Sequence, residues 1–514
     1  MTHVFPSTAP SAAISPQRRA IVIGAGLGGL SAAMRLGAKG YHVQVIDKLD
    51  RLGGRGSSIT TNGHRFDLGP TILTVPHVFE QLWAECGREF HHDVTLKRMD
   101  PYYEIRWPDG TRFAIKDDHQ DMLDEVTRVF PKDVKGYQRF VQDSAARYHF
   151  GFEGLGRRPM NKLTDLLREL PGFVRLRADR SVYAHAAARV KDPKLRMALS
   201  FHPLFIGGDP RNVTSMYILV NHLEAAFGVH YVQGGVQALA DAMGDVIRAQ
   251  GGEILLNATV EQITTKDKTA TGVIANGHAH RADIVVSNAD PFWTYDKLLA
   301  HEPKKRWSPQ KLRSSRWSMG LFVWYFGTKG TAEKWPDLGH HTILNGPRYR
   351  GLLRDIFSKV KLCDDMSLYI HRPSVSDPSV APKGDDTFYV LSPVPNLKTK
   401  NPIEWSTEMA RYKAKVAQIL EAQVMPGFSD TITCEEVFTP HTFKERYLSP
   451  YGAGFSLEPR IFQSAWFRPH NISEDFKNLY LVGAGTHPGA GIPSVVTSSE
   501  VLTQLVPDAA EFVE

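Results

Sequence analysis

Apolar runs and glycine-rich turns alternate near the N-terminus in the order strand, helix, strand. Residues 20–23 form an apolar run of strand length, and residues 30–36 suit a helix that ends at Gly40. A second apolar run, residues 41–46, ends in Asp47. This order places two parallel strands in one sheet that is covered by helices. The pattern therefore predicts an α/β fold with a Rossmann-like domain.

Two later stretches have the pattern of the same domain. Residues 236–249 suit a helix, a strand then leads to Val260, and an apolar run at 284–286 follows a predicted hairpin. Near the C-terminus a strand at 478–482 precedes a glycine-rich loop and a helix over 494–505. The Rossmann-like domain is therefore predicted to be discontinuous.

The predicted domain boundaries follow from these segments. The nucleotide-binding domain is assigned to residues 17–100, 229–290 and 471–514. The two insertions, 101–228 and 291–470, are predicted to form an α+β substrate domain. Residues 1–16 are rich in Ser, Pro and Ala without periodicity, which predicts a disordered tail.

Composition narrows the class of protein. A chain of 514 residues with 42% hydrophobic residues exceeds one ordinary core, which agrees with two domains. Its three cysteines are far apart, so neither a disulfide framework nor a zinc–cysteine site is expected, and a reducing compartment fits best. No run of 18 uncharged apolar residues occurs, so any membrane contact is expected to be peripheral.

The first strand passes into a loop with the spacing G-x-G-x-x-G at Gly24, Gly26 and Gly29. In such loops the first glycine permits a tight turn, the second admits a pyrophosphate, and the third lets helix and strand pack closely. The N-terminus of the helix attracts the phosphates. Asp47 is placed to accept the ribose hydroxyls. Because strand, helix and acid all accompany the loop, a dinucleotide site is predicted.

Two further glycine-rich segments favour a flavin nucleotide. Gly53, Gly54 and Arg55 form a second turn beside the nucleotide site, which suits a longer ligand with a flavin end. The C-terminal loop contains Gly483, Gly485, Thr486, Gly491 and Ile492. With these motifs the chain resembles the flavin-containing amine oxidase and phytoene desaturase superfamily, and most closely its bacterial-type phytoene desaturases. The likeness runs from about Ala20 to the C-terminal loop.

The resemblance implies a cofactor, a substrate and a reaction. The cofactor is FAD, with Gly24, Gly26, Gly29, Asp47, Gly53, Gly54, Arg55, Gly483, Gly485, Thr486, Gly491 and Ile492 as its site. Val260 would lie against the adenine, or it is a buried core valine. The implied reaction is stepwise desaturation of phytoene to a more conjugated carotene, neurosporene or lycopene. An apolar C40 carotene offers no polar handle, so its binding requires a long apolar tunnel.

The electron acceptor and the location also follow from this reasoning. Only one G-x-G-x-x-G loop is present, so a separate pyridine-nucleotide domain is not expected and oxygen or a quinone would take the electrons.

Since the substrate dissolves in the bilayer, we expect a cytoplasmic enzyme attached peripherally to the membrane surface. Residues 161–170 combine leucines at helical spacing with neighbouring basic residues, which suits a membrane-binding helix or an ordinary solvated helix. A nucleic-acid partner is not expected.

Candidate acid–base residues are less distinct. Asp165 and Arg168 are three residues apart and share one helix face, so they are our candidate catalytic pair; an exposed ion pair is the alternative. The adjacent pairs His91-His92 and His340-His341 are expected to point in different directions, so no metal site is predicted. G-x-S-x-G, HExxH and P-loop motifs are absent.

Other functions remain open. Within the same class, the substrate could be a later or hydroxylated carotenoid, or the chain could be an amine oxidase, which would need a polar amine pocket. From another class, a non-catalytic escort for prenyl lipids could use the same architecture. The intact flavin motifs argue against the escort, because it has no use for them.

Overall fold

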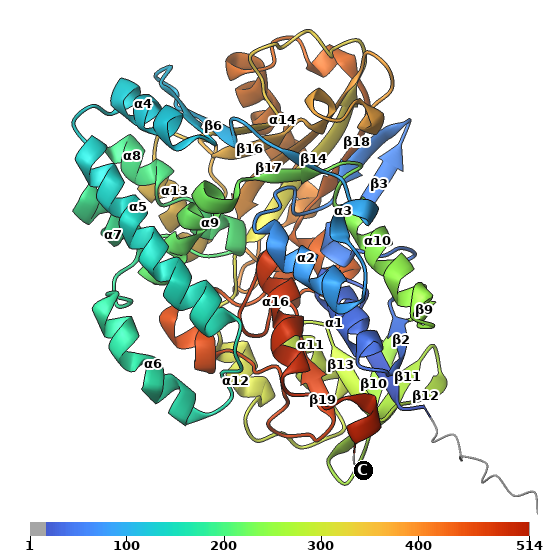
Figure 1. Cartoon of the computed structure of the whole chain (residues 1–514). Helices are drawn as coiled ribbons and strands as arrows, with labels where there is room; N and C mark the ends of the chain where they lie inside the picture. The colour runs from blue at the N-terminus through green and yellow to red at the C-terminus, as the bar shows by residue number, and fades with distance from the viewer. Residues whose placement is uncertain (1–16, 513–514) are drawn as a thin grey trace, which may run out of the picture.

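A computed structural model describes residues 17–512, so the predicted N-terminal tail lies outside the described residues. The first layer is a parallel five-stranded sheet with the order β19-β13-β1-β2-β9. Its strands are β1 (Arg19–Ile23), β2 (His42–Ile46), β9 (Glu253–Leu255), β13 (Ile284–Ser287) and β19 (Leu479–Leu481). They come from three distant parts of the chain (Figure 1). The predicted Rossmann-like α/β class is confirmed.

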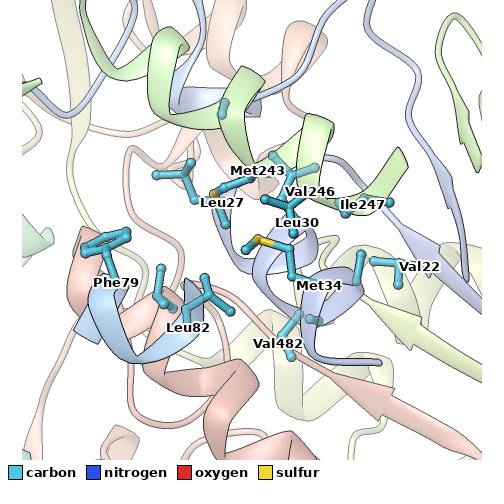
Figure 2. Close-up of a cluster of buried hydrophobic side chains, with 14 of the residues drawn as sticks. Val22, Leu27, Leu30, Met34, Phe79, Leu82, Met243, Val246, Ile247 and Val482 are labelled. Carbon is cyan, nitrogen blue, oxygen red and sulfur yellow. The ribbon is translucent and has the colours of Figure 1, made fainter. Parts of the chain in front are cut away.

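Helices cover one face of this sheet. They are α1 (Leu27–Ala38), α2 (Pro76–Glu85), α10 (Val236–Ala249) and α16 (Ile492–Thr503). Figure 2 shows Leu27, Leu30 and Met34 of α1 packed between side chains of α2 and α10. Because α1 is enclosed by the sheet and by these helices, nearly all its residues are buried.

A small antiparallel sheet covers the other face. It consists of β10 (Val260–Lys266), β11 (Thr269–Ala275) and β12 (His278–Arg281). Ile263 and Val273 pack there against Ile21, Ile23 and Val285 of the parallel sheet. Val260 begins this sheet, which places it near the carboxyl end of β2.

The second layer is a seven-stranded sheet with the order β18-β14-β17-β16-β15-β6-β7. It combines strands of both insertions: β6 (Tyr103–Arg106), β7 (Arg112–Ile115), β14 (Gly320–Thr328), β15 (His341–Leu344), β16 (Leu368–His371), β17 (Asp386–Val394) and β18 (Ile432–Phe438). β6 pairs in parallel with β15, and this pairing joins the two insertions. All nine residues of β14 are buried.

Two small ladders connect the layers. β3 (Ser58–Thr61) pairs with β4 (His64–Asp67), and β5 (Leu96–Arg98) pairs with β8 (His230–Val232).

Most of the remaining helices belong to the two insertions. From the first insertion they are α4 (His119–Val129), α5 (Val134–Tyr148), α6 (Leu163–Arg175), α7 (Val182–Arg189), α8 (Pro193–Ala198) and α9 (Leu219–Phe227). The others are α3 (Phe90–Asp93), α11 (Pro291–Trp293), α12 (Pro309–Ser314), α13 (Tyr349–Arg354), α14 (Trp405–Gln423) and α15 (Pro440–Arg446). α6 lies at the edge of the molecule (Figure 1). It extends five residues past the predicted segment, through Pro171.

Candidate cofactor and substrate cavity

One large cavity extends from the dinucleotide loop into the substrate domain. Its volume is about 700 Å³, and most of its wall is apolar. At one end it is lined by Gly24, Gly26 and Asp47, and elsewhere by side chains of α6, α9, α13 and the large sheet. A single space therefore connects the predicted nucleotide site with an apolar chamber.

The dinucleotide loop has the geometry that its spacing predicts. A Cβ on Gly29 would lie 2.0 Å from the Gly24 carbonyl oxygen, so this position requires glycine. Gly26 is the N-cap of α1 and has no side chain that could accept a hydrogen bond from the first N–H groups of the helix. These N–H groups therefore remain available to a ligand at this end of the cavity. Gly29 itself packs behind the loop, while Gly24 and Gly26 line the cavity.

Asp47 lies at the end of β2 and lines the same end of the cavity. Its carboxylate accepts hydrogen bonds from the N–H groups of Ala25 at 2.6 Å and Leu49 at 2.7 Å. Burial raises the pKa of Asp47, and these two hydrogen bonds act in the opposite direction. The carboxylate is thus held in place beside the glycine loop.

The second glycine turn is tied to the first. The N–H of Gly53 donates to the carbonyl of Ala25 at 2.8 Å, and Gly53 has a φ of +98° that favours glycine. Gly54 and Arg55 follow it along the cavity wall. The Arg55 guanidinium donates to Ser449 Oγ at 2.9 Å, but its Nε has no partner within the described chain.

A second arginine, which the sequence did not indicate, lies at the same wall. Arg446, the last residue of α15, lines the cavity beside Tyr447, and its Nε and one Nη are buried without a partner among residues 17–512. Both Arg55 and Arg446 lie over the Tyr447 ring, each at 5.8 Å from its centroid. Buried donors without acceptors indicate a missing ligand. Two such guanidinium groups beside glycine loops fit the diphosphate of FAD.

The C-terminal loop completes this end of the cavity. Gly483, Gly491 and Ile492 line it, together with Pro488. Gly485 and Thr486 do not line it. Gly485 faces Pro291, and the Thr486 hydroxyl donates to the Gly483 carbonyl at 2.9 Å, so both shape the loop from behind. Val260 lines the cavity and is also buried, which agrees with both of its predicted roles.

The structure does not bring Asp165 and Arg168 to the cavity wall. Asp165 accepts from the Lys162 N–H at 2.9 Å and so caps the N-terminus of α6, whereas Arg168 is exposed. The residues of α6 that line the cavity are Leu166, Leu170 and Phe173, on the opposite side of the helix from Arg168.

A different carboxylate, also missed in the sequence, does line the cavity. Glu224 of α9 is 3% exposed and accepts from His202 Nε2 at 2.9 Å and from the Tyr103 hydroxyl. Burial and the neighbouring carboxylate raise the pKa of Tyr103 well above its usual value, so its hydroxyl stays a donor. Among the described residues of the wall, Asp47 and Glu224 are the acidic ones.

The cavity opens beside α6. Leu170 is 44% exposed, and Ile461 and Phe462 are 38% and 73% exposed, yet all three also line the cavity. Leu163, Leu167 and Val174 extend this apolar surface along α6 at 53%, 54% and 71% exposure. We call these six residues the mouth patch.

The expectation that the His340 and His341 rings point in different directions is wrong. The two rings do not point apart: their centroids are 4.3 Å from each other, and His371 of β16 joins them. The pairing of β15 with β16 causes this, because it places His371 directly opposite His341.

Comparison with known proteins agrees with this geometry. The family model of flavin containing amine oxidoreductase matches residues 27–500. The chain is 62% identical over 506 residues to the phytoene desaturase (neurosporene-forming) of Cereibacter sphaeroides, covering 98% of this chain and 97% of that protein. It is 41% identical over 490 residues to the phytoene desaturase (lycopene-forming) of a Paracoccus species, covering 95% and 97%.

Solved structures share the fold. An oxidoreductase from Methanosarcina mazei has a TM-score of 0.65 at 18% identity and covers 95% of this chain and 100% of its own. Putrescine oxidase bound to putrescine has a TM-score of 0.61 at 16% identity, and the match covers 95% of this chain and 99% of that chain.

Within residues 17–512, no helix combines the length and apolar character needed to cross a membrane. The predicted flavin cofactor is confirmed by the family match, and the chain belongs to the flavin-containing amine oxidoreductases, in their branch of bacterial phytoene desaturases.

Proposed function

We propose that this protein desaturates phytoene stepwise to neurosporene, with FAD as the hydride acceptor. The observation that carries the proposal is the single cavity, which connects the dinucleotide loop with an apolar chamber. Two relatives at 62% identity are named neurosporene-forming, which favours neurosporene over lycopene as the product.

The glycine loops and the two arginines are assigned to the cofactor. Backbone N–H groups at the start of α1, with Arg55 and Arg446, bind the diphosphate, and Asp47 binds the ribose hydroxyls. Val260 contacts the adenine. Gly483, Gly491 and Ile492 enclose the flavin end, and Gly53 and Gly54 bring the second turn close to the first.

The apolar wall is assigned to the carotene. A hydrocarbon gains its affinity from apolar area removed from water, at about 25 cal/mol per Å². Leu204, Phe205, Leu352, Leu353 and Ile356 are among the side chains that provide this area. Such a wall also excludes water from the reacting carbons.

Glu224 is assigned to the proton. Desaturation removes a hydride from one carbon and a proton from its neighbour, and FAD supplies the hydride acceptor. Glu224 is the wall carboxylate that the nucleotide site does not use, and His202 and Tyr103 fix its orientation. We therefore place Glu224, in preference to Asp165 and Arg168, as the proton acceptor.

The mouth patch is assigned to the membrane. Its apolar residues surround the opening, and the basic side chains Lys162, Arg168 and Arg175 flank it on α6. Apolar insertion combined with basic flanks favours an anionic bilayer surface. We propose that α6 seats the opening on the cytoplasmic face of the membrane, where a quinone or oxygen takes the electrons.

The test uses purified holoprotein with FAD and liposomes that contain phytoene. Formation of neurosporene, followed by its absorbance and by chromatography, supports the proposal. A flavin spectrum with unchanged phytoene overturns it in favour of a later carotenoid or an amine as substrate. A protein that binds phytoene but no flavin overturns it in favour of a prenyl-lipid escort.

A further inference from the structure

Three histidines meet at the end of the large sheet, outside the lining of the main cavity. His340 immediately precedes β15, His341 begins it, and His371 ends β16. His341 and His371 are directly opposed in the antiparallel pair, so their side chains lie on one face of the sheet. One nitrogen from each of the three rings lies within 4.8 Å of the others.

These rings are buried without adequate partners. Their exposed fractions are 6% for His340, 3% for His341 and 1% for His371. His340 Nε2 and His371 Nε2 lie 2.9 Å apart, but His340 Nδ1, His341 Nε2 and His371 Nδ1 have no partner in the part of the chain that the structure describes. Buried polar atoms are nearly always paired, so the unpaired Nε2 of His341, beside two further buried imidazoles, indicates an absent ligand.

The ring nitrogens are available as electron-pair donors. Burial lowers the pKa of His341 to about 3, and it lowers the pKa values of His340 and His371 well below normal. Other neighbours include the Tyr231 ring, at 4.8 Å from His340, the Tyr389 ring, at 6.1 Å from His371, and the more distant cation of Lys97. A set of three imidazole nitrogens is a donor set that divalent cations of the transition series prefer.

A supporting hydrogen bond fixes His341. Its Nδ1 lies 2.6 Å from the Tyr369 hydroxyl, which in turn lies 2.6 Å from Thr71 Oγ1. If Nδ1 carries the proton and donates to Tyr369, Nε2 is left as a free acceptor. Histidine ligands commonly donate their second N–H to such a partner.

We propose that His340, His341 and His371 bind one divalent transition-metal ion of the zinc type. Zinc–nitrogen bonds of about 2.0–2.1 Å require ligand nitrogens about 3.4 Å apart. The His340–His371 pair, at 2.9 Å, must therefore open slightly, and the three nitrogens, which lie within 4.8 Å of one another, must draw together around the ion. The ion would join β15 to β16 and would hold Tyr369, whose side chain lines the main cavity. This site does not depend on the proposed desaturation.

The test measures metal content in the untagged full-length holoprotein. After incubation with ZnCl₂ and exhaustive dialysis, elemental analysis is expected to find one zinc per chain. Replacement by Co²⁺ is expected to give the intense visible absorption of a tetrahedral site. His371→Gln and His341→Gln should each retain about tenfold less zinc, while His91→Gln, which changes an exposed histidine, should retain it.

Two results would overturn the proposal. One is a wild-type protein that holds no zinc after dialysis, whatever the variants do. The other is a His371→Gln or His341→Gln variant that keeps full zinc content. Flavin absorbance and circular dichroism identify any variant that does not fold, and His340→Gln then takes its place. None of these readouts depends on desaturase activity.

Discussion

At the scale of single residues, Arg446 has buried guanidinium nitrogens that need hydrogen-bond acceptors from a bound ligand. Its guanidinium has two unpaired nitrogens at the cavity wall, beside Arg55 and Tyr447. A hydrogen bond to a charged group contributes about 2 kcal/mol, so we expect Arg446→Met to weaken FAD binding about 30-fold. Flavin fluorescence titration of the apoprotein measures this change. Arg128→Met, which removes an exposed arginine paired with Glu125, is the matched control. Unchanged FAD affinity in Arg446→Met would contradict the assignment.

Glu224 makes a chemical prediction at the same scale. Glutamine has nearly the same shape but cannot accept a proton, so Glu224→Gln is expected to slow desaturation about 10²- to 10⁴-fold. Its flavin spectrum and phytoene retention should stay those of the wild type. The assay measures the first turnover after phytoene is added. Glu104→Gln, a carboxylate outside the cavity wall, should retain activity. A Glu224→Gln protein with a wild-type rate would exclude this residue as the proton acceptor.

At the scale of elements, α6 is amphipathic with its apolar side exposed, and its prediction concerns membrane binding. Fully burying one such side chain contributes about 1.5–3 kcal/mol. The triple variant Leu163→Ser, Leu167→Ser, Val174→Ser should therefore lose most binding to anionic liposomes while keeping its flavin. Liposome flotation measures the bound fraction. Val375→Ser, at a residue that is 48% exposed and belongs to another segment, is the control. Equal flotation of the triple variant and the wild type would show that α6 does not contact the membrane.

The junction of β4 with α10 predicts a pH dependence. Burial raises the pKa of Asp67 from 3.8 to about 7, although its Oδ1 accepts the Val236 N–H at 3.1 Å. The folded state thus holds this proton more tightly than the unfolded state, so the stabilisation is complete below pH 3.8 and disappears as the pH rises through about 7. Asp67→Asn keeps the hydrogen-bond acceptor without the charge. In this variant the stability should therefore depend less on pH in this range, and the Tm should exceed that of the wild type at pH values above 7. Thermal unfolding from pH 4 to pH 8 tests this, with the exposed Asp245→Asn as control. If the Tm of Asp67→Asn depends on pH as that of the wild type does, the raised pKa of Asp67 is wrong.

At the scale of the whole molecule, the cofactor site joins segments that are distant in the chain. The cavity wall includes Gly24, Arg446 and Gly483, so FAD bound as proposed would contact both layers of the protein. A ligand that binds only the folded state stabilises it by about 2.7 kcal/mol at a concentration 100 times its Kd. We therefore expect the Tm of the apoprotein to rise continuously with FAD concentration. Differential scanning fluorimetry measures the shift, with riboflavin, which lacks the diphosphate, as the matched control. A Tm that does not respond to FAD would contradict a shared site.

The sequence by itself determined the nucleotide-binding unit. The strand, the glycine loop, the helix and Asp47 all lie between residues 20 and 47, and their periodicity and turn chemistry are local properties. Helix α10 has the predicted bounds, and the loop before α16 lies at the cavity as expected. The flavin motifs were recognisable for the same reason, since each one is a continuous stretch of chain.

Only the tertiary structure decided which other side chains meet. Glu224 reaches Tyr103 across 121 positions, and His371 joins His341 through the register of β15 with β16. Arg446 lies near Arg55 because Tyr447 and Ser449, which follow α15, contact Arg55. Helical spacing could place Asp165 and Arg168 on one face of α6, but it could not say whether that face meets the cavity. Local pattern fixes an element and its faces, whereas the packing of distant elements fixes what each face contacts.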